Sequence, residues 1–335
     1  MVKALVDPPS LSEVLSKLVI GQQQAIDAIC PYIEIHISGL SLAERPAGVF
    51  LFLGPTGTGK TRTVEAVAEA LHGDKRKLIR VNCGEFQAPH EIAKLIGAPP
   101  GYLGHRETQP VFTQQKLNAC ISQFSDLAVV LFDEIEKAAP DITRLLLGVL
   151  DKATLHTGDN TLVSFENTLI FMTSNLGSRQ TQEALVGWSP FQKLTIGPIT
   201  NKAASISARA AKKHFSPEFM NRVDAVVTYR ALSDPDLSLI LDRELNLLQE
   251  HIRLRLGEQN LYALEVHKKA HAWLLEKGTS REYGARDLKR TIHREVLLPL
   301  ARMGREIPGL STVQVNVNAA GTALKFKVQR NEACL

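Results

Sequence analysis

Several absences narrow the class of protein before any motif is considered. The four cysteines (Cys30, Cys83, Cys120 and Cys334) are far apart, and none forms a CxxC pair or a zinc-type spacing. A disulfide-built secreted domain and a zinc-stabilised fold are both disfavoured, and reduced thiols are expected. No apolar run approaches the length of a membrane span, and residues 1–9 are too short and interrupted for a secretory signal. We therefore expect a soluble, cytoplasmic protein without a membrane partner.

An excess of charge of one sign is also missing. Lys and Arg number 39 against 35 Asp and Glu, which leaves a net charge of +4, too small to imply nucleic acid or an anionic membrane. Basic residues gather at 75–80 and 281–294, but neither cluster has the aromatic neighbours that base stacking uses. No nucleic-acid partner is expected. The 335 residues, 44% hydrophobic and 22% charged, suffice for two globular domains.

The most informative stretch is an apolar run followed by a glycine-rich turn. Val49–Leu53 reads as a strand covered on both faces, as in a parallel sheet, and helical spacing begins at Thr61. Two glycines allow backbone N–H groups to point at a phosphate, while Lys60 can reach the β- and γ-phosphates and the Thr61 hydroxyl can hold Mg²⁺. The pattern that predicts this nucleoside-triphosphate site is Gly54-Pro55-Thr56-Gly57-Thr58-Gly59-Lys60-Thr61.

A second uncharged strand supplies the other half of the expected site. Leu127–Phe132 runs straight into Asp133 and Glu134. In open α/β sheets, functional groups gather at the carboxyl ends of the strands, next to the phosphate loop. Asp133 is thus expected to hold Mg²⁺ through water, and Glu134 to polarise an attacking water. The alternative is that the two acids only cap the following helix.

The order of elements predicts the fold class. Strands alternate with helices up to about residue 230, which indicates a doubly wound α/β layer with a parallel sheet. After about residue 230 the pattern predicts helices at 234–254, 270–277 and 285–303, followed by a strand pair at 312–317 and 324–328. We expect a large nucleotide-binding domain at 1–230, a smaller and mainly helical domain at 231–330 and a tail at 331–335.

Several longer segments resemble a known family. Gly54–Thr61 and Leu131–Ala138 resemble the Walker A and B motifs of AAA+ ATPases. The match narrows to the second ATPase module of Clp-family unfoldases of the ClpB/ClpA type, and it runs in register from about Val14 to Gln329. It is carried by Leu95–Gly104, Met172–Gly177, Phe215–Asp224 and Tyr283–Arg290. The resemblance implies an AAA+ large domain, a Clp-type small (lid) domain, ATP with Mg²⁺ as cofactors, and ATPase activity.

The resemblance also implies roles for individual residues. Asn175 corresponds to sensor 1, whose amide orients the attacking water or touches the γ-phosphate; the less favoured alternative is an Asn that caps the turn at Gly177. Arg222 stands where the family has the arginine finger that reaches the ATP of the next subunit, which implies a ring, a homo-hexamer; the alternative is an ordinary ion pair. Arg286 corresponds to sensor 2. Two residues match the segment around adenine, where core burial explains them equally well: Val19 and Ile20.

The resemblance further implies a polypeptide substrate. Tyr102 corresponds to the pore-loop aromatic that grips an extended chain, in a loop freed by Gly101 and Gly104. The function expected is an ATP-driven protein-unfolding motor. The main alternative is an ATP-gated assembly switch or regulatory subunit that translocates nothing. A third possibility, a nucleic-acid-acting AAA+ protein such as a helicase loader, is disfavoured by the pore-loop context.

Some positions depart from the family pattern. His105–Pro110 replaces an acidic, Gly-rich run, Ala139 stands where a His is common, and Ile33–Ser38 lacks the usual arginines. The chain resembles one ATPase module only, so recruitment of substrate is expected to come from an adaptor, another partner protein or the unusual segment 178–214. Within that segment Val186-Gly187-Trp188 loosely resembles a peptidase-docking loop, but three residues are weak support.

Overall fold

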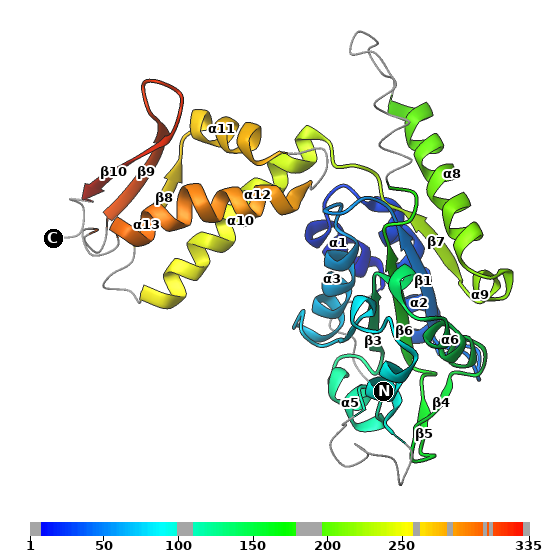
Figure 1. The fold of residues 1–335 in the computed structure, drawn as a ribbon. Coiled ribbons are helices and arrows are strands. Elements are labelled where there is room, and N and C mark those ends of the chain that lie inside the picture. Colours follow the sequence, from blue (N-terminus) through cyan, green and yellow to red (C-terminus); the bar gives the residue numbers. More distant parts are fainter. Residues whose placement is uncertain are drawn as a thin grey trace. The chain divides into compact units, whose positions relative to one another are not determined.

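Figure 1 shows the computed structural model, which describes residues 8–98, 110–178, 196–256, 262–279, 284–303, 307 and 311–330. Residues 8–10, 89, 196–204, 256 and 330 are described by their backbone alone. The chain divides into two compact units. The first comprises residues 1–55 and 59–230, and the second comprises residues 56–58 and 231–335.

A parallel sheet of five strands forms the centre of the first unit. The strands follow the order β2-β3-β6-β1-β7, and every pairing between neighbours is parallel. The doubly wound α/β class expected from the sequence is confirmed. The strands are β1 (Gly48–Leu53), β2 (Ile79–Asn82), β3 (Ala128–Asp133), β6 (Thr168–Ser174) and β7 (Ala225–Thr228).

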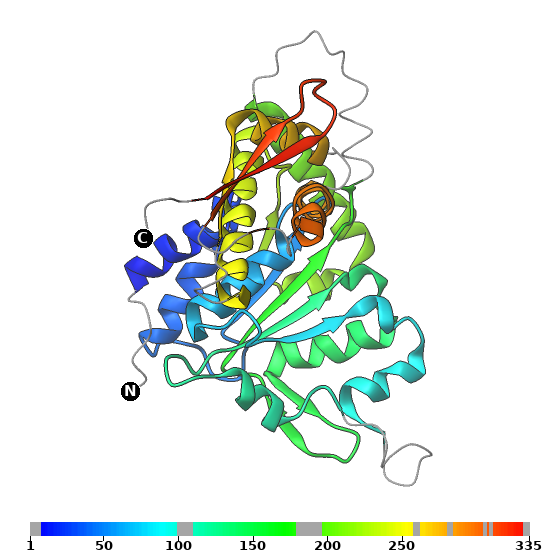
Figure 2. The same cartoon turned by 90° about the vertical axis from the view of Figure 1, so that its left-hand side faces the viewer.

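Helices cover both faces of this sheet, with blue α1–α2 and green α6 on opposite sides in Figure 2. Strand β1 explains why two layers are needed, because all six of its residues are buried. Val49 and Leu51 belong to the core on one face, whereas Phe50 and Phe52 belong to the core on the other. One face carries α1 (Pro8–Leu18), α2 (Gln23–Ile37) and α3 (Lys60–His72); the other carries α4 (Ile92–Ile96), α5 (Gln114–Cys120), α6 (Pro140–Lys152), α8 (Ile196–His214) and α9 (Pro217–Asn221).

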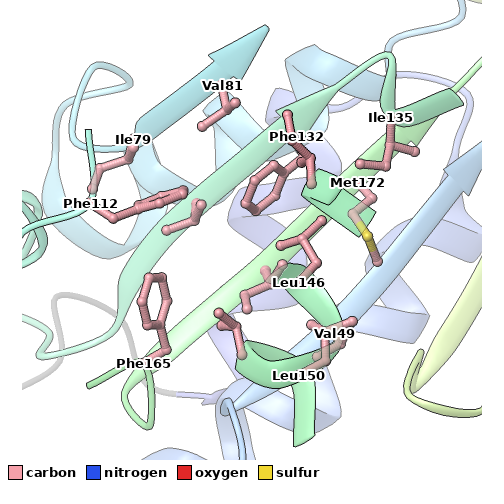
Figure 3. Close-up of a cluster of buried hydrophobic side chains, with 14 of the residues drawn as sticks. Val49, Ile79, Val81, Phe112, Phe132, Ile135, Leu146, Leu150, Phe165 and Met172 are labelled. Atoms are coloured by element: carbon pink, nitrogen blue, oxygen red, sulfur yellow. The ribbon is translucent and has the colours of Figure 1, made fainter. Parts of the chain in front are cut away.

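The core on the α6 face is closely packed. Figure 3 shows Leu146 and Leu150 of α6 lying over Val49, with Phe132 and Met172 on the neighbouring strands. Each of these five side chains is at most 2% exposed. Complete burial of one such side chain is worth about 1.5–3 kcal/mol. This packing makes the sheet a rigid support for the side chains at the carboxyl ends of its strands.

A β-hairpin follows α6. Strands β4 (Thr154–His156) and β5 (Leu162–Ser164) pair antiparallel. At its turn, the Gly158 N–H donates to the Ile96 carbonyl at 2.7 Å, and a Cβ on Gly158 would lie 2.4 Å from the Gly97 carbonyl oxygen. Only glycine fits there. The turn thus holds the residues from which segment 99–109 departs.

The second unit combines helices with a small mixed sheet in the order β10-β9-β8. Strands β9 and β10 are antiparallel, and β8 and β9 are parallel. Leu241, Leu274, Leu288 and Val313 are fully buried in its core. Its elements are α10 (Asp234–Leu256), β8 (Tyr262–Val266), α11 (Lys268–Gly278), α12 (Ala285–Ile292), a π-helical turn (His293–Leu297), α13 (Leu298–Met303), β9 (Ser311–Val317) and β10 (Leu324–Arg330).

Strand β8 is not apparent in the sequence, because five residues alternate only weakly and their partner β9 lies about 50 residues further along the chain. Helix α5 begins after Thr113, whose hydroxyl caps it by accepting from the Lys116 N–H at 3.2 Å. None of the described helices is long and apolar enough to cross a bilayer.

Candidate functional site

The turn after β1 requires glycine at defined positions. Gly54 has φ of 141°, and a Cβ there would lie 2.7 Å from the Tyr229 carbonyl oxygen. Gly59, which precedes α3, has φ of 102°. These left-handed conformations are costly for residues with a side chain. The backbone can therefore curl between the carboxyl end of β1 and the amino end of α3, where N–H groups and the helix dipole favour an anion.

Lys60 lies beneath this turn, at the first position of α3. Its side chain is buried, and its ammonium group donates to the carbonyl oxygens of Gly54 at 2.6 Å and Pro55 at 2.8 Å, and to Asn175 Oδ1 at 2.9 Å. All three acceptors are neutral oxygens. The structure brings together two candidate residues that are 115 positions apart in sequence.

Asn175 connects Lys60 to Glu134. Its Nδ2 donates to Glu134 Oε1 at 3.4 Å while its Oδ1 accepts from Lys60. An ammonium can only donate and a carboxylate can only accept, so the orientation of the amide follows from its two partners. The turn toward Gly177 is closed instead by the Asn175 carbonyl, which accepts from the Ser178 N–H at 3.1 Å. The Asn175 side chain therefore links Lys60 to Glu134, while its main chain closes the turn.

Asp133 lies at the end of β3 with its two oxygens used differently. Oδ1 accepts from the Thr173 hydroxyl and faces the Thr61 hydroxyl at 3.4 Å, and Oδ2 accepts from the guanidinium of Arg80. A hydroxyl beside a carboxylate offers two oxygen ligands of the kind that Mg²⁺ prefers. Phosphate oxygens and water commonly complete the coordination of this ion. The residues present therefore fit the ion that the sequence implies.

Glu134 follows in an unusual backbone conformation. Its φ of 58° and ψ of 50° are left-handed, a conformation that costs a non-glycine residue about 1–2 kcal/mol and is concentrated at functional sites. Its N–H donates to the Thr173 hydroxyl at 3.1 Å, and its Oε2 accepts from Lys137 Nζ at 2.6 Å. This hydrogen bond raises the pKa of Lys137. The carboxylate lies at the sheet edge instead of capping a helix, since it makes no side-chain cap.

Arg222 is positioned away from these contacts. It follows α9, and its guanidinium pairs with Asp151 near the end of α6, with the arginine side chain 34% exposed. The ordinary ion pair considered for this residue is thus present within one chain. The pairing leaves the assignment of an arginine finger open.

The other candidates are distributed more widely. Arg286 is in α12 of the second unit. Val19 is buried among the residues of α1–α3, which agrees with a core role, and Ile20 beside it is half-buried. Tyr102 and Val186–Trp188 lie outside the described residues. In the second unit, His267 caps α11, and His271 Nε2 lies 2.9 Å from Asp242 Oδ1.

Some residues at this edge were missed by sequence reasoning. Thr173 donates to Asp133 and accepts from Glu134, and it is 1% exposed; a hydroxyl in a buried apolar strand was the available signal. Lys137 and Arg80 each pair with one of the two acids. The role of Arg80 could not be recognised from the sequence, because charged residues are common at exposed strand positions. Among the described residues, no group of three or more His, Cys, Asp or Glu side chains could by itself hold a metal.

Comparison with known proteins places this geometry in a family. The family profile described as AAA domain (Cdc48 subfamily) matches residues 45–226, more than half of the chain. The chain belongs to the AAA domain family. A second profile, the C-terminal D2-small domain of ClpB protein, matches residues 232–307. The resemblance to the second ATPase module of ClpB is thereby confirmed.

Individual relatives of this AAA protein agree. The chaperone protein ClpB of Staphylococcus aureus is 37% identical over 96% of this chain and 35% of its own length. ClpB of Rhodopseudomonas palustris is 39% identical over 94% of this chain and 33% of its own length. A closed-state cryo-EM reconstruction of Hsp104 with ATPγS and FITC casein has a TM-score of 0.79 and 31% identity, over 96% of this chain and 51% of that one. The chain thus spans about a third of the length of these curated relatives.

Proposed function

We propose that this chain is an ATP-hydrolysing, protein-remodelling motor that acts as a ring. The observation that carries the proposal is the meeting of Lys60, Asn175 and Glu134 through one amide, beside the Asp133–Thr61 pair. Phosphoryl transfer to water requires a cation, an oriented carboxylate and oxygen ligands for Mg²⁺. This edge of the sheet has all three. Residues 1–230 would form the large domain and 231–330 the small domain.

Each residue has a part in the proposed hydrolysis. The backbone of 54–59 and Lys60 bind the phosphates, and Thr61 with Asp133 would hold Mg²⁺, which when bound neutralises charge on the phosphate oxygens. Glu134 polarises the attacking water, and the Asn175 amide holds the side chains of Glu134 and Lys60 in place relative to each other. Val19 and Ile20 border the base, and Arg286 reports the nucleotide to the small domain.

The neighbouring subunit completes the site in this proposal. Arg222 is always charged, so it can neutralise charge that develops on a phosphate bound by the next copy, in a homo-hexamer. Its partner Asp151 is 41% exposed, and a half-exposed ion pair of this kind is worth less than about 1 kcal/mol. That contact is weak enough for Arg222 to exchange it for a phosphate.

The proposed substrate is polypeptide, gripped by Tyr102. Support comes from the relatives, which include chaperones and an Hsp104 reconstruction with FITC casein. The second candidate, an ATP-gated assembly switch, would share the nucleotide site and would not need Tyr102. An adaptor or another partner would deliver the substrate in either case.

Sizing combined with ATPase assays tests the proposal. The purified chain should assemble from monomer to a ring when ATP is added, and unfolded casein should stimulate its ATPase severalfold. Tyr102→Ala should keep assembly and unstimulated ATPase while losing the response to casein and the unfolding of a tagged protein. Tyr32→Ala would not serve as a control because Tyr32 packs on Phe50; Leu162→Ala, an exposed change on the hairpin, would.

Three results would contradict the motor. A chain that stays monomeric at saturating ATP yet hydrolyses it at full rate after Arg222→Ala has no shared site. Unchanged unfolding by Tyr102→Ala would remove the gripping role. Assembly with ATP but no response of the unmodified chain to any unfolded polypeptide would favour the assembly switch.

A further inference from the structure

Arg80 reaches the nucleotide site from the edge strand of the sheet. Along β2, Ile79 and Val81 are buried in the core on the α6 face, while Arg80 and Asn82 point to the opposite side. Arg80 is level with Leu131 of β3, and Asn82 is level with Asp133. Leu131 belongs to the core on the α3 face, so Arg80 and Asp133 share that face.

The separation suits an arginine. Asp133 lies two residues beyond the position opposite Arg80, which is about 7 Å along the strand direction. The long arginine side chain spans this distance and pairs with Asp133 Oδ2. Asn82 is nearer in register, but its amide is used elsewhere: Nδ2 donates to Glu85 at 2.8 Å and Oδ1 accepts from the Gly84 N–H.

The two oxygens of the Asp133 carboxylate have different partners. Oδ2 is bound by Arg80, and Oδ1 is left to Thr173 and to the Thr61 hydroxyl. Because a carboxylate is planar, a donor that fixes one oxygen also fixes the direction of the other. Oδ1 is the oxygen that lies beside Thr61, the second donor proposed for Mg²⁺.

We propose that Arg80 is a positioning residue that orients Asp133 toward the Mg²⁺ of the bound nucleotide and so sets the affinity for that ion. This inference rests on the proposed ATPase function. It assigns Arg80 no contact with substrate. Arg80 acts through Asp133, as hydrogen-bond partners of metal ligands do elsewhere, where their loss lowers metal affinity about 10- to 100-fold.

Two other roles for the pair make different predictions. As a stabilising ion pair it would matter little, since the Arg80 side chain is 50% exposed and such pairs contribute less than about 1 kcal/mol. As a charge alone, Arg80 would repel a divalent cation, and its removal would tighten Mg²⁺ binding. Orientation predicts the reverse, weaker Mg²⁺ binding with stability almost unchanged.

The test measures binding of a fluorescent, non-hydrolysable ATP analogue to the full chain while Mg²⁺ is varied, with EDTA as the metal-free condition. Arg80→Gln should raise the Mg²⁺ concentration for half-maximal effect about tenfold, the lower end of the range for such partners. Arg80→Lys, which keeps the charge but not the fork, should fall between. Metal-free binding and the melting temperature should match the unmodified chain.

Arg76→Gln is the matched control. Arg76 also pairs with an aspartate, Asp74 at 3.0 Å, but in the exposed turn before β2, with its side chain 84% exposed. It should leave the Mg²⁺ dependence unchanged. Unaltered or tighter Mg²⁺ binding in Arg80→Gln would overturn the inference, and so would an equal loss of metal-free binding. If the unmodified chain shows no Mg²⁺-dependent binding, the proposed function fails as well, and that outcome is recognisable without any variant.

Discussion

The two units bury their strands in different ways. In the first unit, every residue of β1 and of β6 is buried. In the second unit, β8 alternates between covered and exposed positions, and Lys325, Lys327 and Gln329 of β10 are exposed. A parallel sheet with helices on both faces needs continuous apolar strands, whereas a mixed sheet with one open face needs alternation.

This difference decides where chemistry can occur. Strands that are apolar on both faces leave polar groups only at their ends, so Lys60, Asp133, Glu134 and Asn175 are concentrated at one edge of the first sheet. The second sheet has polar side chains along its length, and they are spread over an exposed face. We infer that the first unit supplies the reacting groups, and that the second contributes through α12 and Arg286. The three predictions below test this division.

The largest expected effect is on hydrolysis in the first unit. Glu134→Gln keeps the shape of the side chain and removes its ability to accept a proton from water. We expect the ATPase rate to fall at least about 100-fold, equivalent to roughly 2.7 kcal/mol in the barrier, with nucleotide binding and assembly retained. Steady-state ATPase and nucleotide titration check this. Glu276→Gln, at an exposed glutamate of α11 in the second unit, should change neither, and near-normal turnover by Glu134→Gln would remove Glu134 from its role.

The next effect is on stability in the second unit. Leu288 on α12 is fully buried, and Leu288→Ala should destabilise that unit by about 2–5 kcal/mol through lost burial and a cavity. Hydrogen exchange should become faster in α11 and α12 while β1 and β6 stay protected. Leu254→Ala, at a leucine that is 73% exposed, is the control and should have little effect. Equal loss of protection in β1 would show that the two units do not unfold separately.

The smallest effect is a pH dependence located in the first unit. His72 ends α3 with its Nε2 3.0 Å from the Leu127 carbonyl, which can only accept, so Nε2 carries the proton and Nδ1 accepts from the Ser122 hydroxyl. Burial lowers the pKa of His72 below the ordinary histidine value of 6.5. The unfolded chain therefore takes up a proton more readily than the folded chain as pH falls below about 6.5.

Stability of the first unit should accordingly be full above that pH and decrease as pH falls toward the lowered pKa of the folded state. Urea unfolding at pH 7.5 and pH 5.5, followed by a probe in the first unit, measures the decrease, which should be smaller than the effect of Leu288→Ala. His72→Gln should remove this part of the pH dependence. His156→Gln, at an exposed histidine of β4, should not; if both variants behave alike, His72 is not the source.

Much of the first unit could be predicted from local patterns. The conformation of the apolar runs at 49–53 and 127–132, and of the glycines at 54 and 59, can be predicted from a few neighbouring residues. Strand β8 could not be found in this way, because its alternation is short and its stability comes from pairing with β9. The same holds for Arg80, whose function depends on the register between β2 and β3.

The sequence by itself determined the glycine-rich turn after β1, the parallel sheet and the acids at its edge, because glycine backbone freedom and strand burial are properties of neighbouring residues. Only the tertiary structure decided which groups meet there. It joined Lys60 to Glu134 through Asn175, gave Asp133 its two differently bound oxygens, and paired Arg222 with Asp151. Those contacts depend on strand order and register, which place residues far apart in the chain within hydrogen-bonding distance.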